Sequence, residues 1–323
     1  MKFGLSTLTR GLLTTREAYL TVAKAAETAG FDFLSVNDHI VVPQNLRSAY
    51  PYAAAGVFGA AEHGHAFDQL ATIAFLAGCT ERLRLLTSVL VVPHRPPIQT
   101  AKMLATIDVL SNGRLLVGAG AGWMQEEFEL MGLPFAARGR ATDEYLEAFR
   151  ALWTQERPSY RGEHVRFDAH LFYPKPVQRP HPPIWIGGES AAARRRAIRL
   201  ADAWYPGNNN QGRPLDTPER LAAAIAQIRG ECEKEGRDPA ELGIALLVQD
   251  PFAWRAEPTQ DGSRRRLFTG SSAEMVADVG ALAAIGIDHV AVRFGGTSLA
   301  EALARIERFG GEVIAASTPG AAG

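Results

Sequence analysis

The sequence is poor in the residues that mark secreted, zinc-binding or membrane proteins. It has only two cysteines in 323 residues, Cys79 and Cys232, and neither belongs to a CxxC pair or has a histidine at ligand spacing. We therefore expect neither a disulfide framework nor a metal site. No apolar run approaches the ~20 residues that span a bilayer, and the N-terminal segment lacks the apolar core of a signal peptide. These absences predict a cytoplasmic protein with no membrane partner.

An excess of charge of either sign is also missing. The chain has 34 Lys and Arg against 35 Asp and Glu, which gives a formal net charge of −1. Such a balance provides no electrostatic basis for binding nucleic acid, so no nucleic-acid partner is expected. The chain is 46% hydrophobic and 21% charged, an ordinary globular composition. Its length fits either two domains or one α/β barrel.

Strand-like and helix-like segments alternate along the whole chain. Eight strands are expected, at residues 2–7, 31–37, 82–92, 114–120, 182–188, 202–207, 242–250 and 288–294. The expected helices cover residues 15–29, 67–78, 97–110, 139–153, 190–201, 216–235, 271–285 and 298–314. Eight strand–helix pairs predict a (β/α)8 TIM barrel, since a doubly wound sheet usually has fewer strands and a domain break. Because no linker or change of composition interrupts the chain, we expect residues 1–323 to form a single barrel domain with insertions.

Two segments are too long for ordinary loops. Residues 40–66 follow the expected strand 31–37, at the end of the barrel where active sites lie, so they are interpreted as a lid or a wall on the substrate side. Residues 155–181 contain "SYRGEHVRF", which predicts a short β-hairpin, and then a proline-rich stretch. This second insertion precedes a strand, although folding over the top of the barrel is an alternative.

A glycine-rich segment, "VGAGAGW" at residues 117–123, follows the fourth expected strand. The dinucleotide-binding fingerprint is G-x-G-x-x-G opening a helix in the first βαβ unit, whereas here the spacing is G-x-G-x-G and Trp123-Met124 precede any helix. A Rossmann phosphate loop is therefore disfavoured. Two interpretations remain: a turn that needs glycine for structural reasons, or a backbone left bare so that a flat ligand can approach it. We favour the second.

A different strand end has the features of an anion site. Gly187-Gly188-Glu189-Ser190 closes the fifth expected strand and opens a helix, where free N–H groups and the helix dipole favour a phosphate. Arg194 to Arg196 in that helix can add positive charge, but a solvated helix face is the favoured interpretation of the run. The sequence thus predicts the phosphate of a planar cofactor at this strand end.

From Lys2 to about Phe294 the chain resembles the luciferase-like monooxygenase superfamily. The resemblance is carried by "FDFLSVNDH", "LRLLTSVLVVPHRPP", "DVLSNGRLLVGAGAGWMQEEFELMG", "YLEAFRALW", "YPKPVQRPHPPIWIGG" and "AIRLADAWYP". It implies a TIM barrel with insertions that binds a flavin, either FMN or the deazaflavin coenzyme F420, over the C-terminal mouth. It also implies a small-molecule substrate and a homodimer.

The resemblance assigns residues to the cofactor. Ser88 and Val89 match a bulge that backs the ring and often contains a cis non-proline peptide bond. The segment beside the ring and its side chain comprises Gly118, Ala119, Gly120, Ala121 and Gly122, and the phosphate loop comprises Gly187, Gly188, Glu189 and Ser190. Trp123 stands where a sugar-phosphate dehydrogenase of the F420 branch has a catalytic glutamate, which argues against that alcohol oxidation. Trp123 is expected to shape the pocket or stack near the cofactor.

The pair Asp38-His39 matches one that is common in the F420 branch. It favours an F420-dependent oxidoreductase that transfers a hydride to or from a small organic substrate. The alternatives are an FMN-dependent monooxygenase, which uses reduced flavin and oxygen, and a non-catalytic flavin binder. His39 is the candidate to move the proton, or else it orients a ligand. Asp38 is expected to orient His39 or to cap the turn. Secondary candidates are His94-Arg95 and Arg293, which are expected to face the site. Tyr52, Phe58 and Phe67 are expected to line the pocket, and His63 and His65 lie in the first insertion.

Overall fold

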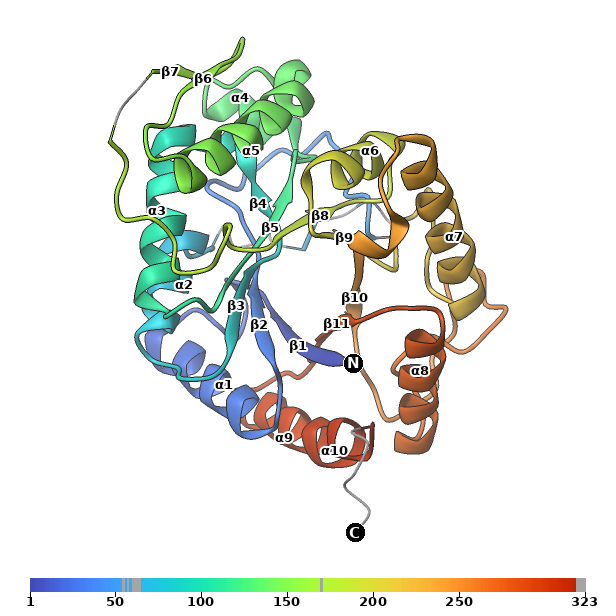
Figure 1. The fold of residues 1–323 in the computed structure, drawn as a ribbon. Coiled ribbons are helices and arrows are strands. Elements are labelled where there is room, and N and C mark those ends of the chain that lie inside the picture. The colour runs from blue at the N-terminus through green and yellow to red at the C-terminus, as the bar shows by residue number, and fades with distance from the viewer. Residues whose placement is uncertain (54–55, 57, 60–64, 169–170, 318–323) are drawn as a thin grey trace.

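The computed structural model describes residues 1–53, 56, 58–59, 65–168 and 171–317 of the 323-residue chain. A ring of parallel strands is surrounded by helices (Figure 1). The ring consists of β1 (Lys2–Thr7), β2 (Phe33–Val36), β3 (Arg84–Thr87), β5 (Leu115–Gly120), β8 (Ile184–Gly187), β9 (Ala203–Tyr205), β10 (Gly243–Pro251) and β11 (His289–Arg293). Pairing of β1 with β11 and of β3 with β5 closes it. The predicted (β/α)8 TIM barrel is confirmed.

The third expected strand is divided in two. It continues past β3 as the short strand β4 (Leu90–Val91), which pairs with the end of β5. The break falls at Ser88-Val89, whose peptide bond is cis, as the resemblance implied. The bulge lies at the C-terminal mouth, where it turns the Val89 side chain toward the ends of β5 and β8.

The helices begin and end close to the expected positions. They are α1 (Arg16–Thr28), α2 (Gln69–Ala77), α3 (Pro97–Leu110), α5 (Arg138–Thr154), α6 (Ala191–Leu200), α7 (Pro218–Lys234), α8 (Ser272–Ala284) and α9 (Leu299–Phe309). Six of them start at a Thr, Asp or Ser whose side chain accepts a backbone N–H, which explains why the starts were readable. The expected helix 298–314 instead ends at Phe309 and continues as a π-helical turn (Gly310–Ile314) and α10 (Ala315–Ser317). None of the described helices is both long and apolar enough to cross a bilayer.

The core has two parts. Outward-facing strand residues such as Leu5, Leu34 and Leu85 pack against the helices in one large cluster. A smaller cluster fills the barrel itself: Phe33, Leu86, Leu116, Trp185, Ala203, Tyr205, Ala245 and Ala291. Alternation along each strand separates the two sets, so the barrel interior is packed with side chains and leaves ligand space only at its mouth.

The second insertion lies mostly outside and below the barrel. Its predicted hairpin is present as β6 (Tyr160–Arg161) and β7 (Arg166–Phe167). Farther on, Gln178 bonds Asp108 at the end of α3 and the carbonyl oxygen of Leu115 at the start of β5. None of the described residues of this insertion lines the cavities at the C-terminal mouth, so the alternative that it covers the top is wrong for its described part.

Candidate active site

A cavity of about 490 Å³ opens at the C-terminal mouth of the barrel. Loops that follow six strands of the ring contribute to its lining, together with residues of β10 and β11 themselves. Most of the residues predicted for the site line it: Asp38, His39, Ser88, Val89, Gly120, Ala121, Gly122, Trp123, Gly187, Gly188 and Ser190. The lining does not include Gly118, Ala119 or Glu189. The structure thus gathers at one cavity predicted residues as far apart in the sequence as Asp38 and Ser190.

A buried carboxylate holds His39. The Nδ1 atom of His39 lies 3.0 Å from Oε2 of Glu127, whose side chain is 1% exposed. The other carboxylate oxygen accepts the backbone N–H of Ile40 at 2.7 Å. Burial alone would raise the pKa of Glu127, but these hydrogen bonds and the nearby His39 and His94 outweigh it and lower that pKa. Because an ionised carboxylate only accepts, Nδ1 carries the hydrogen and Nε2 is left for a ligand.

The expectation that Asp38 orients His39 is wrong. The Asp38 carboxylate accepts two hydrogen bonds from Arg95, each 2.8 Å long, and the backbone N–H of Val91 at 2.9 Å. Consecutive residues of extended backbone point to opposite sides, so Asp38 reaches the loop after β4 while His39 reaches the segment after β5. Arg95 is consequently committed to Asp38 and Asp68, and only His94 of the pair His94-Arg95 lines the cavity.

The Asp38–Arg95 pair leads to a stability prediction. Asp38 is fully buried, so Arg95→Met leaves an uncompensated charge inside the protein. We expect the free energy of unfolding at pH 7 to fall by about 3 kcal/mol, measured by urea denaturation. Arg157→Met removes the same charge from an exposed position and should change stability by less than about 0.5 kcal/mol. Equal effects of the two substitutions would show that the buried pair does not stabilise the fold.

Sequence reasoning passed over Glu126 and Glu127 as the start of the next segment. They begin the short helix α4 (Gln125–Leu130), and both are buried. Glu126 accepts the backbone N–H groups of Arg47 and Ser48 at 2.8 and 2.9 Å, while Glu127 holds Ile40. The two carboxylates therefore attach the first insertion to the barrel mouth. Two adjacent acids directly after the glycine-rich segment and Trp123-Met124, in "WMQEEFELMG", were the available signal.

Protein atoms fill much of the space that the glycines leave. A Cβ on Gly118 would lie 2.0 Å from the carbonyl oxygen of Thr87, and one on Gly120 would lie 2.7 Å from Val89. A Cβ on Gly187 would lie 2.9 Å from the same valine. Gly120 and Gly187 make room for Val89 of the bulge, although both also border the cavity. Gly118 lies inside β5 and makes room for Thr87 at the end of β3, so protein packing explains all three positions.

Aromatic side chains form one wall of the cavity. Trp123 packs against Tyr50 and Phe58 of the first insertion, with ring centroids 5.1 and 5.5 Å apart. Tyr52 also lines the cavity, whereas Phe67 does not. Residues 40–66 thus supply a wall of the site in their described part. His63 lies outside the described residues, and His65 borders a second, neighbouring cavity.

One end of the cavity is suited to an anion. Gly188 and Ser190 border it at the N-terminus of α6, where the Ser190 side chain accepts the N–H of Ala193. The buried Glu189 carboxylate does not line the cavity and accepts the N–H of Gly207 at 2.6 Å. Arg138, which sequence reasoning missed because no motif marks it, borders the same end. Its guanidinium donates to the carbonyl oxygens of Gly122 and Phe135, and no carboxylate among the described residues pairs with it.

The arginine run of α6, Arg194 to Arg196, was interpreted as a solvated helix face. Arg194 and Arg196 are 4% and 7% exposed, and they form ion pairs with Glu231 and Asp143. Arg195 alone lies on the exposed face. A solvated face is therefore wrong for two of the three arginines. Since Arg194 and Arg196 are already paired, Arg138 is the better placed cation for a phosphate.

His94 is a further candidate contact. It is 7% exposed, and neither ring nitrogen has a hydrogen-bond partner among the described residues. Burial lowers its pKa, which keeps the ring neutral at pH 7. A neutral imidazole bordering the cavity can donate one hydrogen bond to a ligand and accept another.

Residues 1–260 match the model of the luciferase-like monooxygenase family. The chain belongs to this family. An uncharacterized protein of Mycobacterium tuberculosis is 36% identical to this family member over 228 residues, which cover 70% of this chain and 78% of the relative. An FMNH(2)-dependent dimethylsulfone monooxygenase of Pseudomonas putida is 34% identical over 207 residues, covering 62% and 54% of the two chains.

The fold of this luciferase-like protein is also that of a solved relative. The coenzyme F420-dependent tetrahydromethanopterin reductase of Methanopyrus kandleri superimposes with a TM-score of 0.74. The match covers 98% of this chain and 99% of the reductase at 16% sequence identity. At this identity the likeness establishes the fold and leaves the cofactor open. Enzymes of both cofactor types are therefore similar to this family member.

Proposed function

We propose that this protein is an oxidoreductase that binds coenzyme F420 and transfers a hydride to or from a small organic substrate. One observation carries the proposal: His39, held through Nδ1 by the buried Glu127, borders a cavity that has an anion-binding end and an aromatic wall. A hydride transfer to a polar double bond must be accompanied by one proton at a defined atom. A histidine held by a carboxylate is suited to deliver or remove it.

The residues of the cavity fit the parts of such a cofactor. Gly188, Ser190 and Arg138 offer N–H groups and a cation to its phosphate. The bulge at Ser88-Val89 and the segment from Gly120 to Gly122 offer an uncharged surface for a flat ring. When bound, the deazaflavin would supply or accept the hydride, which is chemistry that none of these side chains provides.

The protein's own side chains would position the proton carrier and exclude water. Glu127 fixes the orientation and the tautomer of the His39 ring, so that His39 presents Nε2 to a ligand and can hold or release a proton there. Trp123, Tyr50 and Phe58 form an apolar wall that keeps water from the reacting atoms.

A second candidate is an FMN-dependent monooxygenase. The similarity to the FMNH(2)-dependent dimethylsulfone monooxygenase of Pseudomonas putida, which is 34% identical, favours it. The phosphate and ring surfaces described above suit FMN equally, since both cofactors have a flat tricyclic ring and a phosphate. The two candidates differ in cofactor and in the need for oxygen.

Side-by-side titration of the purified protein with F420 and with FMN separates these candidates. We expect F420 to bind the more tightly, as measured by fluorescence. Arg138→Met should weaken its binding about tenfold, which is the effect of losing one charged hydrogen bond to the phosphate. The matched control Arg157→Met, at an exposed site outside the cavity, should bind like wild type. Tight binding of FMN alone would overturn the choice of F420 and favour the monooxygenase.

A further inference from the structure

Two arginines face the cavity from adjacent strands. Arg10 follows β1, and Arg293 is the last residue of β11, which pairs with β1 along its length. Both side chains border the main cavity and a neighbouring one of about 730 Å³. Sequence reasoning considered Arg293 for an anionic substrate but did not single out Arg10.

Neither arginine has an ion-pair partner among the described residues. The Arg10 guanidinium lies over the ring of Phe58, 4.7 Å from its centroid, and no hydrogen bond from it is found in the described part of the chain. Arg293 donates only to the carbonyl oxygen of Gln249, at 3.3 Å. Burial and the like charge of Arg293 lower the pKa of Arg10, and burial also lowers the pKa of Arg293. Two cations thus share a partly buried space without a described counter-charge.

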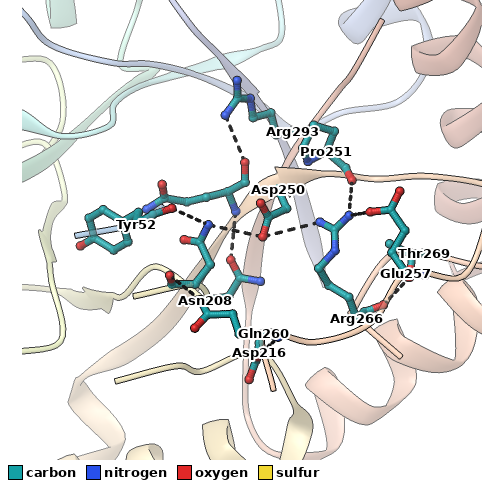
Figure 2. Close-up of polar contacts among 12 residues, drawn as sticks. Tyr52, Asn208, Asp216, Asp250, Pro251, Glu257, Gln260, Arg266, Thr269 and Arg293 are labelled. Carbon is teal, nitrogen blue, oxygen red and sulfur yellow. Dashed lines mark hydrogen bonds and ion pairs between the residues drawn. The ribbon is translucent and has the colours of Figure 1, made fainter. Parts of the chain in front are cut away.

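The carboxylate that acts electrostatically on Arg293, Asp250, has other partners. Figure 2 shows that the contact of Arg293 goes to a main-chain oxygen, while Asp250 is contacted by Arg266. The Asp250 oxygen lies 3.6 Å from Arg266 and 3.3 Å from the amide nitrogen of Asn209. Asp250 attracts Arg293 weakly from a distance, and its 40% exposed side chain leaves that attraction screened by water.

The two arginines lie far from the phosphate end. In the closed ring of strands, β1 is four strands away from β8 in either direction, so it lies opposite β8 across the mouth. Gly188 and Ser190 follow β8, whereas Arg10 follows β1. One phosphate cannot contact both ends. An anion at Arg10 and Arg293 is therefore a different group from the one expected at α6.

We propose that Arg10 and Arg293 bind the carboxylate of an organic acid that is the substrate. This inference rests on the proposed oxidoreductase function and names its substrate class. The carboxylate lies between the two guanidinium groups, which supply several N–H donors and relieve their mutual repulsion when the anion binds. The apolar body of the acid lies against Phe58 and Tyr50, which border the same cavity, and so extends toward the His39 side of the site.

Calorimetric titration with sodium benzoate tests this site, with the neutral isostere benzamide as the matched ligand. We expect benzoate to bind the wild-type protein at least tenfold more tightly than benzamide. Arg10→Met and Arg293→Met should each weaken benzoate binding about tenfold or more and leave benzamide unchanged. The control Arg157→Met should bind benzoate like wild type. Equal binding of the two ligands, or benzoate binding that neither substitution weakens, would overturn the proposal.

Two further measurements keep the result unambiguous. Because neither arginine has a described counter-charge, both variants should melt within about 4 °C of wild type, so that lost affinity is not lost folding. F420 titrations of the same variants should match wild type; a loss as large as that of Arg138→Met would assign the arginines to the acidic tail of the cofactor and overturn the proposal. Since benzoate is titrated without cofactor, failure of F420 to bind would refute the proposed function and leave the carboxylate site standing.

Discussion

His39→Ala is expected to lower kcat by about 100-fold or more, because in the proposed function His39 holds or releases the proton that accompanies hydride transfer. The measurement is steady-state turnover of the F420-loaded protein with organic acids as substrates. The binding of F420 and the melting temperature should stay near wild type, since the His39 ring is not part of the phosphate end. Undiminished turnover in a folded, cofactor-bound variant would show that His39 only orients a ligand.

A related prediction concerns Glu127, which positions the His39 ring and is tested by Glu127→Gln. We expect a comparable loss of kcat, because an amide does not fix the tautomer of the imidazole as a carboxylate does. Steady-state turnover of the F420-loaded variant measures the loss, and F420 binding should stay near wild type. Glu129→Gln, the same change two residues along α4 at a half-exposed site, should leave kcat unchanged. Undiminished kcat in Glu127→Gln would reduce Glu127 to an anchor of the first insertion.

Gly118→Ala is expected to destabilise the barrel by about 3 kcal/mol or more, the upper range for forcing a methyl group into a packed interior. The new Cβ would lie 2.0 Å from the Thr87 carbonyl oxygen, and that oxygen belongs to a strand whose position the neighbouring strands fix. Neither strand can move without displacing the bulge at Ser88-Val89. The midpoint of urea unfolding measures the loss.

Gly230→Ala is the matched control for this substitution. Gly230 lies within helix α7, and a Cβ there would meet nothing within 4 Å. The change should stabilise the protein by about 0.5–1 kcal/mol, since alanine loses less conformational freedom than glycine on entering a helix. If Gly118→Ala unfolds at the same urea concentration as wild type, the close packing of β5 against β3 is not what selects glycine there.

The fold could be predicted because its signals are local. Strand and helix segments are marked by their own apolar patterns and by capping residues such as Thr15, Thr217 and Ser271, and their number indicated a closed barrel. One of the motifs that carry the family resemblance also has a structural role. Arg114 of "SNGR" donates to carbonyl oxygens of Ala77, Thr80 and Leu83, and so ties the end of α2 to the strands at the bottom of the barrel.

The candidate site could be predicted only in outline. A residue at the C-terminal end of a barrel strand borders the mouth whatever its partners are, which is why His39, Gly120 and Ser190 were found. The partners themselves were not predictable. Glu127 lies 88 positions from His39, and adjacent side chains at a strand end point in opposite directions, so the neighbouring Asp38 was the natural but wrong choice.

The sequence by itself determined the barrel, its family and the edge at which chemistry takes place, because each depends on periodicity and on motifs within short stretches of chain. Only the tertiary structure decided which carboxylate holds His39, which arginines are paired and which are free, and why Gly118 is glycine. These outcomes depend on distances between loops that meet only when the ring of strands closes. An ion pair or a packing contact needs two residues, and closure of the ring of strands decides which residues meet.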